Sequence, residues 1–155
     1  MNTELNDRQE IWRGLLYGQR SMMLRLSVEL KRDFGLNSAQ FEALLYLWEA
    51  KANRLPATQL SNQLLYSSGS GSHLISRLEQ LHLVRRDRDS QDARMVVVTL
   101  TEAGLDLISR ARAAHIESLA KEFDPLIGDA EVPVLLDFAR RLSRHESVTS
   151  QPYSG

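Results

Sequence analysis

Residues 57–100 read ATQLSNQLLYSSGSGSHLISRLEQLHLVRRDRDSQDARMVVVTL, and the fold is decided in this stretch. Its first part predicts a short helix over 57–64, because Pro56 suits a helix start. A second helix is predicted over 68–82, since Ser67 is a good N-cap and apolar residues then recur at helical spacing. Two helices joined by a tight turn form a helix-turn-helix.

The hydrophobic period changes after the second helix of this pair. Residues 83–86 form a short extended run, residues 87–93 are polar, and residues 95–100 are apolar and β-branched. Such a pattern predicts a β-hairpin with a polar tip. A helix-turn-helix followed by a hairpin is a winged helix-turn-helix, whose second helix enters the major groove of DNA.

Helices are also predicted on the N-terminal side of this stretch. A long helix over 7–33 contains no proline and ends near Gly35, which suits a helix C-cap. Asn37 and Gln40 form a capping-box pair that opens the next helix. The apolar residues of that helix lie on one face: Phe41, Leu44, Leu45 and Trp48.

Two further helices are predicted on the C-terminal side. Thr101 caps a helix that extends to about residue 123, where Pro125 and Gly128 interrupt it. A last helix is predicted over 131–144, and the polar tail after it is expected to be flexible. The predicted fold class is therefore mainly α with a small β-hairpin wing.

Charge is distributed unevenly along a chain whose formal net charge is only −1. Residues 51–100 carry seven Lys/Arg against four Asp/Glu, whereas residues 101–155 carry six against nine. A basic middle can present a positive face to nucleic acid even in a nearly neutral protein. No cysteine, signal-peptide pattern or membrane-length apolar run is present, which fits a cytoplasmic protein.

The start of the second helix of the pair is the strongest candidate for a DNA contact. A helix N-terminus offers free backbone N–H groups to phosphate, and serine hydroxyls add donors. With the apolar face packed inward, polar side chains point outward together and can reach bases or phosphates. The candidate residues are Ser67, Ser68, Ser70, Ser72, His73, Ser76 and Arg77. A flexible Ser/Gly linker is the alternative, and the apolar helical face that follows argues against it.

The predicted hairpin tip supplies the second candidate contact. Arginines on a narrow hairpin can enter a minor groove or bind phosphates, and the candidates are Arg86, Arg88 and Arg94. A solvated charged turn with weak local ion pairs is the alternative interpretation. The adjacent helix-turn-helix favours DNA.

Enzymatic and metal chemistry find little support in the sequence. The Ser/Gly stretch lacks the Lys-Ser/Thr of a P-loop and does not spell Gly-x-Ser-x-Gly. The four histidines show no zinc-site spacing, and no cysteine assists them. The chain is therefore expected to be no enzyme and to need no cofactor or metal, although a small-molecule enzyme on a helical scaffold stays a competing hypothesis.

Several short motifs occur together in one order: Leu36-Asn37, Gln40-Phe41, Ser67–Ser70, Arg77–Glu79, Leu83-Val84, Asp92-x-Arg94 and Leu100–Gly104. On these motifs, residues 36–119 resemble the MarR family of transcription regulators. The resemblance implies a triangular homodimer held by the first, fifth and sixth helices, and repression that small aromatic acids or phenols relieve. It implies that Asp92 orients the wing loop, and that Arg94 supports the loop or faces DNA. Gly71 departs from the family, which usually has a larger apolar residue there, and Leu74 stands where some relatives carry arginine.

The resemblance also implies a domain organisation. One winged helix-turn-helix regulator unit is expected over 1–146, with a DNA-binding lobe over 36–100. The helices over 7–34 and 101–146 would form the dimer, and residues 147–155 a flexible tail.

An effector pocket is implied between the dimer helices and the DNA-binding lobe. Arg20 could pair there with a carboxylate of a small aromatic or phenolic ligand. Ordinary core and dimer packing is the alternative, and it is favoured for these aromatic residues. The candidate pocket residues are Trp12, Tyr17, Arg20, Met23, Tyr46 and Trp48.

The function expected from these observations is sequence-specific transcription regulation. A homodimer would repress by binding a palindromic site in double-stranded DNA, and a small aromatic ligand would release it. A winged-helix module that binds another protein, without DNA, is the alternative that the near-zero net charge suggests. The operator, the regulated genes, the effector and the sign of regulation do not follow from the sequence.

Overall fold

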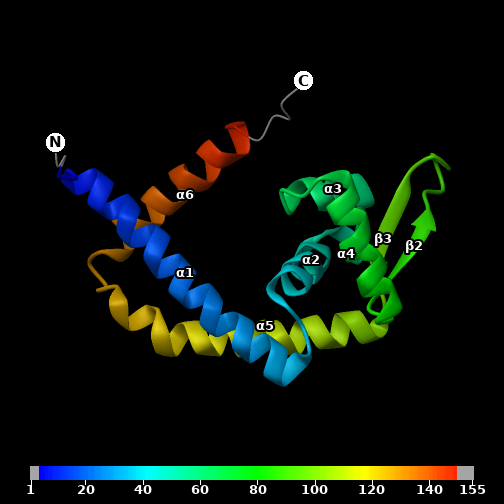
Figure 1. Cartoon of the computed structure of the whole chain (residues 1–155), viewed down its shortest axis with the longest axis horizontal. Helices are drawn as coiled ribbons and strands as arrows, with labels where there is room; N and C mark the ends of the chain where they lie inside the picture. The colour runs from blue at the N-terminus through cyan, green and yellow to red at the C-terminus, as the bar shows by residue number, and fades with distance from the viewer. Residues whose placement is uncertain (1–3, 150–155) are drawn as a thin grey trace. The chain divides into compact units, whose positions relative to one another are not determined.

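The computed structural model describes residues 4–149, with side chains described as far as residue 144. The chain forms two compact units that divide between His115 and Ile116. Figure 1 shows the course of the chain, with labels that are used below. The predicted single unit over 1–146 therefore stays a prediction, and each compact unit is described by itself.

Two capped helices open the first unit. Helix α1 (Asp7–Phe34) begins at a capping box between Asn6 and Gln9, which the sequence analysis did not identify, and ends at Gly35 with φ 69°. Helix α2 (Ser38–Glu49) begins at the predicted capping box, in which Asn37 Oδ1 accepts from Gln40 N at 2.9 Å. The predictions for Gly35, Asn37 and Gln40 are confirmed.

The helix-turn-helix follows a short 3₁₀ turn, η1 (Lys51–Asn53). Its first helix is α3 (Ala57–Gln63) and its second, the recognition helix, is α4 (Ser68–Gln80). Ser67 caps α4 as predicted, because its Oγ accepts from Ser70 N at 3.3 Å. The prediction that Pro56 lies in the first turn of α3 is wrong.

Pro56 instead ends a strand, β1 (Arg54–Pro56), and takes extended torsions of φ −54° and ψ 137°. The predicted hairpin is confirmed as β2 (Val84–Arg88) and β3 (Val96–Leu100), which pair antiparallel with Val84 opposite Leu100. The sheet order is β1-β3-β2. Three residues show too little alternation to mark β1 as a strand in the sequence.

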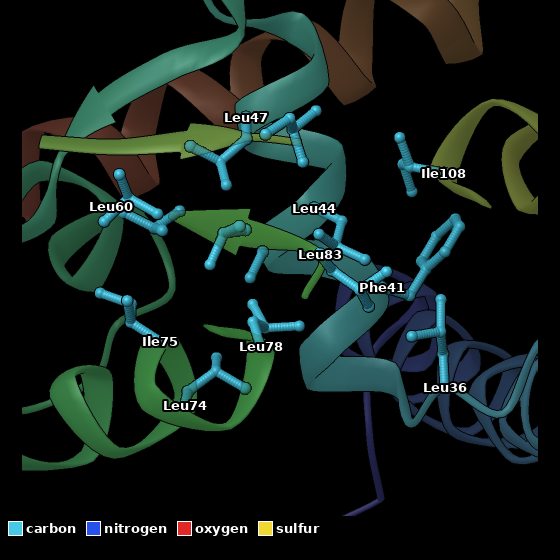
Figure 2. Close-up of a cluster of buried hydrophobic side chains, with 14 of the residues drawn as sticks. Leu36, Phe41, Leu44, Leu47, Leu60, Leu74, Ile75, Leu78, Leu83 and Ile108 are labelled. Carbon is cyan, nitrogen blue, oxygen red and sulfur yellow. The ribbon is translucent and has the colours of Figure 1, made fainter. Parts of the chain in front are cut away.

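The core of the first unit lies between the sheet and helices α2, α3 and α4. Figure 2 shows Leu44 and Leu47 of α2 among the side chains of Leu60, Ile75 and Leu78. All five are at most 1% exposed. Burying each of these side chains contributes roughly 1.5–3 kcal/mol, so this cluster holds the recognition helix against the lobe.

Gly71 lets the two helices of the helix-turn-helix approach closely. A Cβ built on Gly71 would overlap Ser61 Oγ and lie 2.6 Å from Ser61 Cβ. Gly71 is buried, as its predicted place on the inner face requires. The departure from the family pattern thus has a structural reason, since a side chain here would separate α3 from α4.

The start of helix α5 (Glu102–Glu122) is fixed to the foot of the wing. Thr101 caps it as predicted: its Oγ1 accepts from Gly104 N at 3.0 Å and donates to the His82 carbonyl at 2.7 Å. Thr101 N donates to the Leu83 carbonyl at 3.1 Å. Ile108 and Ala111, farther along α5, are fully buried in the core.

The second unit comprises the end of α5, a 3₁₀ turn, η2 (Asp124–Leu126), and helix α6 (Val132–Thr149). Helix α6 extends past the predicted end at residue 144. Of the tail predicted over 147–155, residues 147–149 belong to α6, and the rest lies outside the described residues. No helix within residues 4–149 is long and apolar enough to cross a membrane.

Candidate nucleic-acid interface

The recognition helix α4 has one buried face and one exposed polar face. Leu74, Ile75 and Leu78 point into the core as predicted. Except for Ser76, which is half-buried, the candidate residues of this helix and its cap are exposed: Ser67, Ser68, Ser70, Ser72, His73 and Arg77. The amphipathic pattern therefore brings six of the seven together on the surface, although their contact with DNA stays a prediction.

Arg77 is the cation on the exposed face of α4. Its Nη1 donates to Gln80 Oε1 at 3.2 Å, one turn farther along the helix. No ion pair holds Arg77 among the described residues, so its charge faces solvent. A guanidinium in this state can form a bidentate contact with a guanine edge or with a phosphate.

The wing tip is ordered by two aspartates. Asp89 Oδ1 accepts from Gln91 N at 2.8 Å and from Asp92 N at 3.2 Å, and Asp92 Oδ1 accepts from Arg94 N at 2.9 Å. The two backbone hydrogen bonds, and less strongly the Arg54 guanidinium, lower the pKa of the Asp89 carboxyl. The position of Asp92 agrees with the loop-orienting role implied by resemblance. Asp89 was not predicted as a loop-ordering residue, although Asp-x-x-Asp is a turn-forming pattern.

The wing arginines differ in their partners. Arg85 pairs with Asp87 at 2.8 Å, and Arg88 Nη1 donates to the Ala93 carbonyl at 3.2 Å. The Arg94 guanidinium is exposed and has no such partner within residues 4–149. Arg94 is therefore the wing cation most available to a phosphate.

Arg86 differs from these three because its guanidinium is directed at α4. It donates to the Ser72 carbonyl and to Ser76 Oγ, both at 2.9 Å, and to Glu79 Oε2 at 3.2 Å. Its backbone N–H also donates to Glu79 Oε1 at 3.3 Å. Four hydrogen bonds thus join β2 to three residues of the recognition helix that lie about one turn apart, Ser72, Ser76 and Glu79.

A groove of about 530 Å³ lies between α3, α4 and the wing. None of its lining residues is acidic. Ala57, Ile75, Met95 and Val96 supply apolar surface. Hydrogen-bond donors converge on it from all three elements: Thr58 and Asn62 from α3, Ser68 and Ser72 from α4, and Arg94 from the wing. Thr58 and Asn62 were not predicted as site residues, because nothing in the sequence marks a polar residue of a short helix as facing a groove.

The six residues predicted for an effector pocket are not brought together by any cavity described in the structure. Trp12, Tyr17, Arg20 and Met23 are exposed on α1, whereas Tyr46 and Trp48 pack half-buried against the core. The Trp48 ring lies 4.4 Å from the Arg112 guanidinium of α5, a cation–π contact that the sequence did not indicate. The pocket stays a prediction.

Comparison with known proteins gives these features a context. Residues 25–111, more than half of the chain, match the family model of the transcriptional regulators SarA/Rot. The organic hydroperoxide resistance transcriptional regulator of Bacillus subtilis is 33% identical over 97 residues, or 63% of this chain and 65% of that regulator. The regulator MhqR of the same organism is 27% identical over 108 residues, which are 70% of this chain and 72% of MhqR.

Solved structures extend the likeness to almost the whole chain. AbsC, a MarR family transcriptional regulator from Streptomyces coelicolor, is 28% identical with a TM-score of 0.83 over 96% of this chain and 100% of AbsC. A second MarR family regulator from that organism, solved in complex with DNA, shares the fold. Its TM-score is 0.81 at 23% identity, over 99% of this chain and 94% of that one. The chain is thus a winged-helix transcriptional regulator of the MarR type and belongs to the SarA/Rot family.

Proposed function

We propose that this protein regulates transcription by binding double-stranded DNA through α4 and the wing. The observation that carries the proposal is the arrangement of free donors around the acid-free groove. Arg94 lines this groove from the wing, and Arg77 lies on the exposed face of α4. Both are exposed cations without an ion-pair partner among the described residues. Phosphate binding needs such uncompensated donors, and base readout needs a helix that presents polar side chains.

In the proposed complex the contacts divide by chemistry. The exposed face of α4 enters the major groove, where Arg77 and His73 reach base edges. The serines at the start of α4 bind phosphate oxygens, as do Thr58 and Asn62 across the groove. Arg94, with Arg88 beside it, contacts the backbone or the minor groove from the wing. The DNA complex of the structural relative supports this use of the fold.

Replacing Arg77 with alanine is expected to weaken binding to the specific duplex about tenfold or more. A bidentate arginine contact discriminates between bases by about 1–3 kcal/mol, and most of that would be lost. Arg94→Ala should weaken binding to the specific duplex and to an unrelated duplex alike, because it removes a phosphate contact. The salt slope, which is the slope of log affinity against log salt concentration, should become smaller by about one. Fluorescence anisotropy at two salt concentrations measures both, with DNA from upstream of the chain's own coding sequence.

Arg85→Ala is the matched control, since Arg85 pairs with Asp87 on its own strand and should change affinity little. Unchanged binding in both the Arg77 and Arg94 variants would contradict the proposed interface. A wild-type chain that binds no duplex at low salt, yet retains a protein partner, would favour the protein-interaction module instead.

The regulator is proposed to act as a homodimer. Large apolar side chains stand exposed on α1, where Tyr17, Leu24 and Val28 are 63%, 63% and 65% exposed. On α6, taken separately, Val134 is 71% exposed. Apolar surface of this extent is typical of a protein interface, and a second copy would bury it. A symmetric dimer presents two recognition helices to a palindromic site.

Sedimentation equilibrium is expected to give twice the 17.6 kDa mass of one chain. Titration at micromolar DNA should saturate at two chains per duplex. A chain that stays monomeric at these concentrations would rule out the proposed dimer.

Repression relieved by a small aromatic acid completes the proposal. The ligand would bind near Trp12, Tyr17, Arg20, Met23, Tyr46 and Trp48, and would release DNA only by binding the two conformations with different affinity. Adding phenolic acids to the anisotropy assay tests this. Trp48→Ala and Arg20→Ala should lose the ligand response while they retain DNA binding.

A further inference from the structure

The Arg86 hydrogen bonds cross between two elements that both face the proposed DNA. Arg86 lies on β2, and its side chain is 29% exposed. Its partners Ser72, Ser76 and Glu79 lie on α4 over two turns of the helix. Because a guanidinium is planar and rigid, several simultaneous hydrogen bonds fix the orientation of one element against the other.

DNA binding alone does not explain why Glu79 stands on the recognition helix. It is an acid on the recognition helix, and an acid near a phosphate backbone weakens binding. Its carboxylate accepts from both the guanidinium and the backbone N–H of Arg86. Arg86 also contributes to the groove wall, but its hydrogen bonds point to protein acceptors.

We propose that Arg86 and Glu79 are positioning residues that hold the wing at a fixed orientation to the recognition helix. This inference rests on the proposed DNA-binding function and refines it. With the wing fixed, Arg94 meets the phosphates at a set distance from the bases that α4 reads. Binding therefore includes little ordering of the wing. Ser76, predicted to contact DNA, then serves as an acceptor for Arg86.

The hydrogen bonds of Arg86 to Glu79, Ser72 and Ser76 are called the brace below. The brace and a direct phosphate contact of Arg86 predict opposite changes in DNA affinity for Glu79→Ala. If Arg86 only binds phosphate, removing the acid frees Arg86 and increases DNA affinity. If the two residues form a brace, Glu79→Ala loosens the wing and decreases affinity for a long duplex about tenfold. Asp87→Ala is the matched control. It also removes one negative charge, but from a wing residue whose ion pair is with Arg85 and not with α4, so it should increase DNA affinity slightly.

Arg86→Lys separates charge from geometry. Lysine keeps the charge but has a single donor nitrogen, which cannot replace the two guanidinium nitrogens that contact Glu79, Ser72 and Ser76. The brace therefore predicts a loss of similar size. Arg94→Lys is the control and should stay close to wild type, because a phosphate contact tolerates either cation. In both brace variants the salt slope should stay near that of wild type, as no phosphate contact is removed.

Duplex length distinguishes a misplaced wing from a generally weakened fold. On a duplex too short to reach the wing, Glu79→Ala and Arg86→Lys should bind like wild type, whereas global unfolding would weaken both lengths equally. Amide hydrogen exchange of the free protein completes the test without DNA. Residues 84–100 should exchange faster in these two variants than in wild type or Arg94→Lys.

The outcomes separate the two proposals. Faster exchange in the wing with no DNA binding by wild type would retain the brace and refute the proposed function. Unchanged exchange, or a tighter complex with Glu79→Ala, would overturn the brace while the proposed function stands.

Discussion

Replacing Gly104 with alanine is expected to destabilise the protein by about 2 kcal/mol or more. A Cβ built on Gly104 would overlap the Leu83 carbonyl oxygen and lie 2.9 Å from the Leu83 carbonyl carbon. These are backbone atoms, and the same carbonyl accepts from Thr101 N at 3.1 Å. Removing this overlap therefore requires the start of α5 to move away from the wing. Overpacking typically costs about 1–3 kcal/mol, and an overlap with backbone atoms lies at the upper end of that range or above it. The helix propensity of alanine returns about 1 kcal/mol, which leaves a net loss of about 2 kcal/mol or more.

Urea unfolding at one fixed protein concentration measures this effect, since the stability of a dimer depends on concentration. Gly69→Ala is the control, because a Cβ there has nothing within 4 Å. It should leave stability unchanged or raise it by up to about 1 kcal/mol. A Gly104 variant as stable as the Gly69 variant would show that α5 does not need this close approach.

Gly71→Ala carries the second large effect, and it affects both stability and DNA binding. Rotation of the Ser61 hydroxyl relieves the overlap with Oγ but leaves Ser61 Cβ at 2.6 Å from the new methyl group. Helix α4 must therefore shift from α3, which displaces the exposed face that carries Arg77. We expect a loss of about 1–2 kcal/mol in unfolding free energy. Binding to DNA should also weaken, because the displaced face no longer places Arg77 where the wild-type helix does.

A compensating change tests the cause. Ser61→Gly removes both clashing atoms, so Gly71→Ala should cost less in the Ser61→Gly background than in wild type. The double-mutant cycle gives a coupling energy of about 1 kcal/mol or more for residues in contact. Strict additivity of the two changes would show that the destabilisation has another origin.

The local elements of this protein were largely predictable because their signals are short-range. Asn37 with Gln40, Gly35, Ser67 and Thr101 all act where the sequence analysis placed them. Capping depends on side chains within three or four residues of a helix end, and so it is visible in a linear sequence. The recognition helix and the hairpin follow from periodicity for the same reason.

The candidate site was predictable only as an amphipathic pattern. Because the apolar face of α4 is buried, the pattern predicts which side chains of the helix are exposed. These include most of the serines, His73 and Arg77. Nothing local indicated that Arg86, unlike Arg94, is turned toward Ser72 and Glu79. All arginines of the wing look alike in sequence, because the choice between solvent and protein partners depends on atoms in another element.

The sequence by itself determined the order of the helices, the hairpin and the positions of the caps, since each depends on neighbours along the chain. Tertiary structure alone decided three further features: the pairing of β1 with β3, the close approach at Gly71, and the donors that Thr58 and Asn62 bring to the groove. These depend on contacts between residues distant in sequence, and packing geometry rather than local propensity selects them.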